Sequence, residues 1–180
     1  MKEYLQDGLT FYLEICGNLP NGGAIQSCKL GDFDYGCEPN EHKNYIYRIK
    51  YTNINGKDFE LSAKQVQDFC KENGLNAVPE LYYGYAKDFY DEDVRIEEFN
   101  RMGKLSDVNL EKWQEGFLNA VKEKYNEKNC YLSKNKVPEE GAVVRVEGTN
   151  CEVYKCKSFA FLRAETIDLD SGKIDIESDN

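Results

Sequence analysis

The pattern of hydrophobic and polar residues along the chain predicts several strands. Residues 9–16 (LTFYLEIC) are rich in aromatic and β-branched side chains, which is typical of a strand. Residues 44–53 alternate in character, and an extended chain places every second side chain on one face: Tyr45, Tyr47, Ile49 and Tyr51. The Asn55-Gly56 step then predicts a hairpin turn into a further strand over residues 58–62.

Helices are predicted by a different spacing and by capping residues. Ser62 and Gln65 have the spacing of a capping box, and the helix that they begin is expected to end at Gly74. A second helix is expected to begin near residues 106–109, with one apolar stripe that faces the core: Leu110, Trp113, Phe117 and Val121. A third helix is expected over residues 88–100.

Two further strands are expected late in the sequence. GAVVRVE (141–147) and EVYKCKSF (152–159) flank a short polar turn and are predicted to pair as a hairpin. Residues 17–39 contain Asn-Gly and Gly-Gly steps and are expected to form a long loop. These elements together predict an α+β fold with mixed or antiparallel sheets and flanking helices. We expect one domain over residues 1–180, with an acidic segment over about 160–180.

Composition and charge restrict the classes of function. The 180 residues are 41% hydrophobic and 31% charged, which is typical of a globular protein, and no apolar run approaches the roughly 20 residues that a membrane helix needs. The chain has 23 basic and 33 acidic residues, so a nucleic acid can be bound only through a local patch or through residues outside this chain. The seven cysteines form no C-x-x-C pair, which predicts reduced thiols and a cytoplasmic location rather than a zinc site.

The last predicted hairpin carries candidate chemistry. Lys155 and Lys157 are two residues apart, so both ammonium groups leave one face of the strand, roughly 7 Å from each other. Glu140 directly precedes the neighbouring strand. A carboxylate that faces two lysines suits a metal-bound phosphate, because the acid holds the cation and the lysines hold phosphoryl oxygens. A surface salt bridge on an ordinary hairpin is the alternative that this spacing leaves open.

Four segments, in order, resemble motifs of the covalent nucleotidyltransferases, which include RNA ligases, DNA ligases and mRNA capping enzymes. They are similar to motifs III, IIIa, IV and V: FYLEICG (11–17), the strand that ends in Tyr47-Arg48-Ile49, EGAVVR (140–145) and KCKSF (155–159). Residues 138–161 look especially like phage-type ATP-dependent RNA ligases. The resemblance covers residues 9 to about 170 and implies an ATP-grasp-like nucleotidyltransferase domain of the ligase type.

The resemblance also implies roles for individual residues. Glu14 would contact the ribose or metal side of the nucleotide, and Tyr47 would stack on adenine. Glu140 would support Mg²⁺ or Mn²⁺, while Lys155 and Lys157 would bind the α-phosphate of ATP and offset the charge that develops during transfer. We therefore expect Glu140 and the two lysines to face Glu14 and Tyr47 across one polar cleft.

The sequence departs from the family in two places. Arg48 stands where relatives commonly have aspartate, so its ion-pair partner must differ, and Tyr45 is the nearest rival to Tyr47 for stacking. No Lys-x-Asp-Gly string is present, although the family forms its lysyl-AMP intermediate on that lysine. We expect this chain to be the later two-thirds of the domain and inactive by itself.

Several partners and alternatives follow from this interpretation. RNA 5′-phosphate and 3′-hydroxyl ends are the expected substrates of the intact enzyme, and an N-terminal segment that carries the motif I lysine is an expected partner. Self-association through an unpaired sheet edge is expected as well. The alternatives are a DNA ligase, a capping-type nucleotidyltransferase and a non-catalytic nucleotide-binding remnant.

Overall fold

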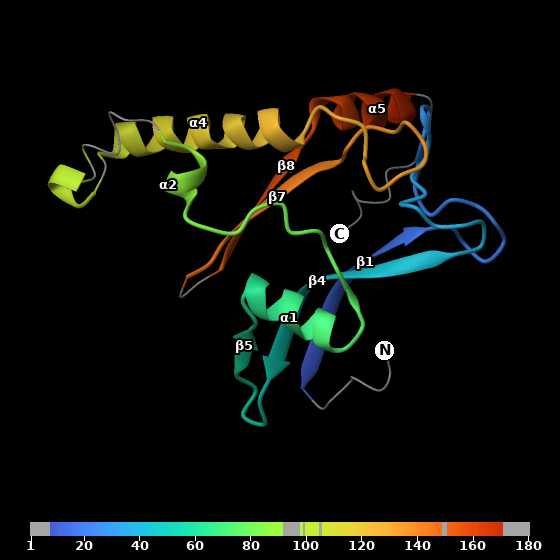
Figure 1. Ribbon diagram of the computed structural model, residues 1–180, viewed down its shortest axis with the longest axis horizontal. Coiled ribbons are helices and arrows are strands. Elements are labelled where there is room, and N and C mark those ends of the chain that lie inside the picture. Colours follow the sequence, from blue (N-terminus) through green and yellow to red (C-terminus); the bar gives the residue numbers. More distant parts are fainter. Residues whose placement is uncertain (1–7, 92–97, 99, 105, 149–150, 171–180) are drawn as a thin grey trace.

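Two long antiparallel strands form the centre of the main sheet. A computed structural model describes residues 8–91, 98, 100–104, 106–148 and 151–170. Strand β1 (Leu9–Gly17) pairs with β4 (His42–Thr52), as Figure 1 shows. Strand β4 also pairs antiparallel with β5 (Asp58–Glu60) and parallel with the short β6 (Asn76–Ala77). The strand over residues 9–16 and the hairpin through Asn55-Gly56 are therefore confirmed.

Strand β4 contains a β-bulge at Tyr47. The cross-strand pairs on either side of it are Tyr12–Arg48 and Leu13–Ile46, so Tyr47 has no residue opposite it on β1. As a result Ile46 and Ile49, three residues apart, are both buried in the same core cluster. The predicted uninterrupted alternation over residues 44–53 is wrong, because the extra residue moves Tyr45 off the face that Ile49 occupies.

One helix covers one face of this sheet. Helix α1 (Ala63–Glu72) begins with both hydrogen bonds of the capping box between Ser62 and Gln65, and Gly74 follows its C-cap with φ of 63°. The predicted helix and both of its ends are confirmed. Its buried side chains, Val66 and Cys70, pack against the isoleucines of β4 to form the core of this half of the molecule.

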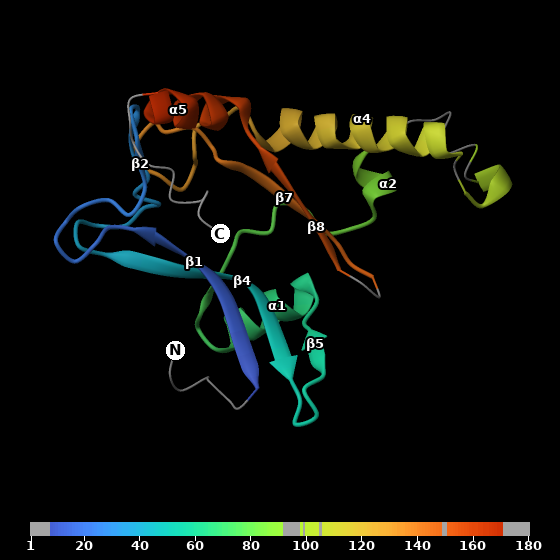
Figure 2. The same cartoon turned by 180° about the vertical axis from the view of Figure 1, so that it is seen from behind.

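A separate hairpin and two helices form the other half of the chain. Strand β7 (Gly141–Val146) pairs antiparallel with β8 (Glu152–Lys157), which confirms the predicted hairpin. Helix α4 (Asp107–Tyr125) confirms the helix expected near residues 106–109, and α5 (Phe159–Asp170) follows β8. Figures 1 and 2 show the hairpin beside α4, with the β1–β4 sheet and α1 beyond it.

The remaining elements are short. Helix α2 (Ala86–Phe89) overlaps only the start of the helix expected over residues 88–100, and most of the rest of that range lies outside the described residues. Strands β2 (Ser27–Cys28) and β3 (Gly31–Asp32) form a small ribbon inside the predicted loop. The fold is α+β, as predicted. No helix in the described part of the chain has the length and apolar character that a membrane span requires.

Candidate functional site

The two candidate lysines lie on one face of the β7–β8 hairpin, which we call the lysine face. Opposed residues of an antiparallel ladder share a face, and the relevant pairs are Val143–Lys155 and Gly141–Lys157. Lys155 is exposed. Lys157 is half-buried, and its Nζ lies 3.1 Å from Oε1 of Glu165 on α5 and 5.4 Å from the centre of the Phe161 ring. The second lysine is thus held by α5, whereas the first is open to solvent.

The opposite face of the hairpin is occupied by the protein itself. Ala142 and Cys156 lie on that face and are both buried. The Asn126 side chain, just after α4, donates a hydrogen bond of 2.8 Å to the Cys156 carbonyl. Since this buried side is the one against α4, the lysine face turns away from that helix.

Arg145 connects the lysine face to the main sheet. It pairs with Val153 and so lies on the same face of the hairpin as the lysines. Its Nη2 donates a 2.7 Å hydrogen bond to the Leu61 carbonyl and lies 3.3 Å from Oε1 of Glu60. The Arg145 end of the lysine face is therefore joined to the corner where β5 meets α1.

The face of the main sheet away from α1 carries the other candidate residues. Phe11 and Leu13 pack on the core cluster beneath α1, so the alternate residues Tyr12 and Glu14 point to the other side. The bulged Tyr47 joins them, with its ring centre 6.3 Å from that of Tyr12 and 42% of the residue exposed. We call this surface the tyrosine face.

Both candidate carboxylates contribute to the raised pKa of one cysteine. The pKa of Cys16, at the end of β1, is raised to about 11 by burial first, then by the charges of Glu14, Cys37 and Glu140. Burial and the charge of Glu140 likewise raise the pKa of Tyr35. Glu14 and Glu140, which are far apart in the sequence, therefore act on the same small region of the fold.

Arg48, which stands where relatives commonly have aspartate, forms its ion pair with Glu60. Its Nη2 lies 2.5 Å from Oε2 of Glu60, and this hydrogen bond is the largest cause of its raised pKa. Its guanidinium also lies 5.0 Å from the centre of the Tyr12 ring. Sequence reasoning missed both Glu60 and Arg145. The contact of Glu60 could have been inferred from the predicted hairpin. Its register places Glu60 opposite Lys50 on β4 and diagonal to Arg48.

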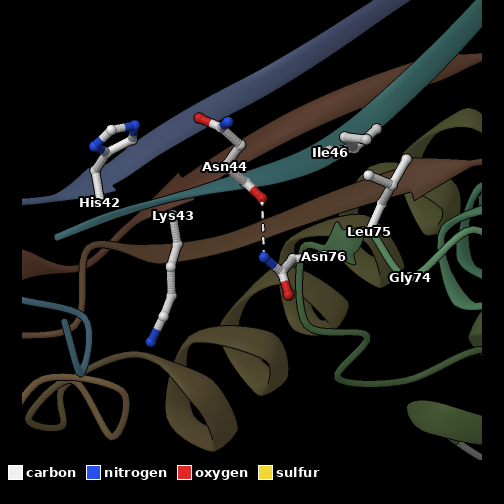
Figure 3. A pocket seen from close by; sticks show the side chains of 7 residues that line it. All are labelled: His42, Lys43, Asn44, Ile46, Gly74, Leu75 and Asn76. Atoms are coloured by element: carbon white, nitrogen blue, oxygen red, sulfur yellow. Dashed lines mark hydrogen bonds between the residues drawn. The ribbon is translucent and has the colours of Figure 1, made fainter. Parts of the chain in front are cut away.

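Two hollows lie away from these faces. One, of about 300 Å³, lies where β4 meets β6, and Figure 3 shows its lining of His42, Lys43, Asn44, Ile46, Gly74, Leu75 and Asn76. Within it Asn76 Nδ2 donates a 3.4 Å hydrogen bond to the Asn44 carbonyl. The other, of about 380 Å³, includes Asp34 and Lys134. None of the five residues predicted to bind nucleotide or metal lines either hollow.

The described residues contain no group of three or more His, Cys, Asp or Glu side chains placed to hold a metal ion. A Mg²⁺ site that shares its ligands with a nucleotide needs only one or two carboxylates, because phosphate oxygens and water supply the rest. Comparisons with protein-family models, with curated proteins and with solved structures find no match to this chain.

Proposed function

We propose that this chain is the later part of the nucleotidyltransferase domain of an ATP-dependent RNA ligase, with the ATP-grasp-like architecture of that class. One observation carries the proposal. Arg145 on the lysine face is paired with Glu60, which also binds Arg48 beside Tyr12 on the tyrosine face, and the candidate residues lie in segments that resemble motifs III to V in that order. Base, ribose and phosphate groups would then be held between the two faces.

Each side chain has the chemistry for one part of the nucleotide. The exposed ring of Tyr47 offers a surface on which adenine can stack. Lys155 offers an exposed ammonium to the α-phosphate, and Lys157 would be shared between a phosphate oxygen and Glu165. Their positive charges would stabilise the pentacoordinate phosphorus as negative charge gathers on its oxygens.

Glu14 and Glu140 fit a divalent cation that accompanies ATP. Both carboxylates contribute negative potential at Cys16, so both lie within electrostatic reach of one point. Mg²⁺ or Mn²⁺ held there would neutralise phosphate charge when bound with the nucleotide. The tyrosine face and the lysine face would orient the base and the α-phosphate around it.

In an intact ligase of this kind, a lysine amine attacks the α-phosphorus of ATP and pyrophosphate leaves. The resulting AMP is passed to an RNA 5′-phosphate, and a 3′-hydroxyl then displaces AMP to join the strands. Because no Lys-x-Asp-Gly string occurs in this sequence, the first step has no family nucleophile here. This absence favours a second candidate function for the chain alone, namely reversible nucleotide binding without catalysis.

Titration with ATP tests the nucleotide site through matched substitutions. Tyr47→Ala should weaken binding by about 1–3 kcal/mol through lost stacking. Lys155→Met should also weaken binding, whereas Lys64→Met, which removes an exposed lysine on α1, should leave it unchanged. Equal affinities for wild type, Tyr47→Ala and Lys155→Met would refute the proposal.

A further inference from the structure

Glu60 lies at the junction between the two halves of the proposed site. Its Oε2 is 2.5 Å from Nη2 of Arg48 on β4, and its Oε1 is 3.3 Å from Nη2 of Arg145 on β7. The Glu60 side chain is 19% exposed and that of Arg145 is 15% exposed, so this part of the ion triad is largely shielded from water, whereas the Arg48 side chain is 36% exposed. Such a shielded network is geometrically strict, because each charge depends on the others for compensation.

A second carboxylate fastens the same corner. Oε1 of Glu147, directly after β7, accepts a 2.5 Å hydrogen bond from the Ala63 backbone N–H in the first turn of α1 and lies 3.1 Å from Nε of Arg145. The first turn of α1 has no acidic residue of its own, so Glu147 supplies the negative charge that a helix N-terminus favours. Arg145 adds its hydrogen bond to the Leu61 carbonyl. The end of β7 is thereby attached to β5 and α1 through side chains.

We infer that Glu60 is a positioning residue that sets the lysine face relative to the tyrosine face, an inference that rests on the proposed function. On one side, Glu60 holds Arg48 against Tyr12, whose ring neighbours that of Tyr47. On the other side, it holds Arg145, which shares its strand and face with Val143, the residue opposite Lys155. One carboxylate therefore connects the surface for the base with the surface for the phosphate.

The arginines show why this carboxylate is hard to replace. The Nε atoms of Arg48 and Arg145 are buried and make no hydrogen bond, although Arg145 Nε is within ion-pair distance of Glu147. Without Glu60, the shielded guanidinium group of Arg145 would face that of Arg48 with less negative charge between them, and β7 would move outward to hydrate Arg145. Lys155 would move with its strand, while the core beneath α1 would stay packed.

Hydrogen exchange measured residue by residue tests the attachment directly. In Glu60→Gln, amides of β7 and β8 should exchange about tenfold faster than in wild type, because the hairpin opens more often, while the core amides of α1 keep their rates. Asp68→Asn is the matched control, since it breaks an exposed 2.8 Å ion pair with Lys64 on α1. Unchanged hairpin exchange, or equal acceleration throughout the chain, would overturn the inference.

A second variant tests the same attachment if Glu60→Gln does not fold. Arg145→Lys keeps the charge but cannot reach both Glu60 and the Leu61 carbonyl with the fixed geometry of a guanidinium, so it should loosen the same hairpin to a smaller degree. Hairpin exchange in Arg145→Lys equal to that of wild type would again overturn the attachment.

Titration of the same variants with ATP distinguishes the positioning role of Glu60 from the proposed function. ATP affinity should fall about tenfold in Glu60→Gln and be unchanged in Asp68→Asn. If the wild-type chain shows no response to ATP, the proposed function fails, and the exchange data still decide whether Glu60 holds the hairpin. If Glu60→Gln frees the hairpin but binds ATP as tightly as wild type, the positioning role is overturned while the proposed function stands.

Discussion

At the scale of single residues, the thiol of Cys16 responds to both candidate carboxylates. Its pKa of about 11 reflects burial, then the charges of Glu14, Cys37 and Glu140. Only the thiolate reacts with alkylating reagents. At a pH below the pKa, each unit by which the pKa is raised lowers the thiolate fraction about tenfold. Cys16 should therefore react slowly with iodoacetamide at pH 9, as followed by peptide mass mapping.

Removing either charge should accelerate that reaction. Glu14→Gln and Glu140→Gln should each raise the alkylation rate of Cys16 about two- to fivefold, because less negative charge then opposes the thiolate. Glu152→Gln, at the far end of the hairpin, is the control and should have no effect. If Glu140→Gln leaves the rate of Cys16 unchanged, Glu140 does not share the neighbourhood of Glu14.

Asp34 gives a prediction about pH and stability. Burial raises its pKa, but hydrogen bonds from the Lys134, Gly36 and Asn135 backbone N–H groups and the Ser133 hydroxyl outweigh burial, so its pKa falls below 3.8. A lowered folded-state pKa stabilises the protein above pH 3.8, and this contribution is lost as the pH falls through the folded-state value.

Asp34→Asn should therefore lower the free energy of unfolding by about 1–3 kcal/mol at pH 7, because it leaves buried donors with fewer acceptor sites. The difference from wild type should shrink as the pH falls below 3.8, and denaturant unfolding across pH measures it. Asp32→Asn, at an exposed neighbouring position, is the control. A difference between Asp34→Asn and wild type that is the same at every pH would contradict this role for the ionised carboxylate.

At the scale of elements, helices α1 and α4 differ in how they begin. Ser62 and Gln65 make both bonds of a capping box at α1, whereas the Ser106 side chain makes no capping hydrogen bond at α4. Ser62→Ala should lower the free energy of unfolding by about 1 kcal/mol. Ser106→Ala should lower the free energy of unfolding by only a few tenths of that amount. Chemical denaturation of both variants measures the difference, and equal losses would show that the box contributes nothing specific.

Local elements were predictable because their signals are local. The capping box, the Asn55-Gly56 turn and the two-residue spacing of Lys155 and Lys157 each depend on neighbouring residues, and the structure has all three. The bulge at Tyr47 was not predictable, because it depends on how β1 and β4 register against each other. Cross-strand register is set by packing of the whole sheet, which a single strand does not encode.

In the candidate site, too, only the features that depend on neighbouring residues could be predicted from the sequence. That both lysines share a face could be read from the sequence. Two ion pairs could not be predicted from the sequence, because each joins residues from separate elements: Lys157 with Glu165, and Arg145 with Glu60. The proposed arrangement of the lysine face and the tyrosine face rests on the link from Glu60 to Arg145.

At the scale of the whole molecule, the chain should form no covalent AMP adduct. That step needs a lysine amine in line with the α-phosphorus and partly deprotonated, whereas an ordinary lysine has a pKa near 10.4. Lys155 and Lys157 are proposed to hold phosphate as charged groups, which is the opposite protonation state. Incubation with ATP and Mg²⁺ followed by intact mass measurement tests this. A mass increase of one AMP on the chain would show that the nucleophile has been misplaced.

The most direct test of the central claim is an ATP titration of the ¹⁵N-labelled chain followed by NMR. With Mg²⁺ present and ATP raised to about 10 mM, binding with a Kd on the order of 1 mM is measurable. The amide signals around Glu14 and Tyr47 should shift together with those of Lys155 and Lys157, and all should follow one binding curve. Shifts confined to one face, shifts only at the hollow in Figure 3, or none at all would contradict a nucleotide site formed between the two faces.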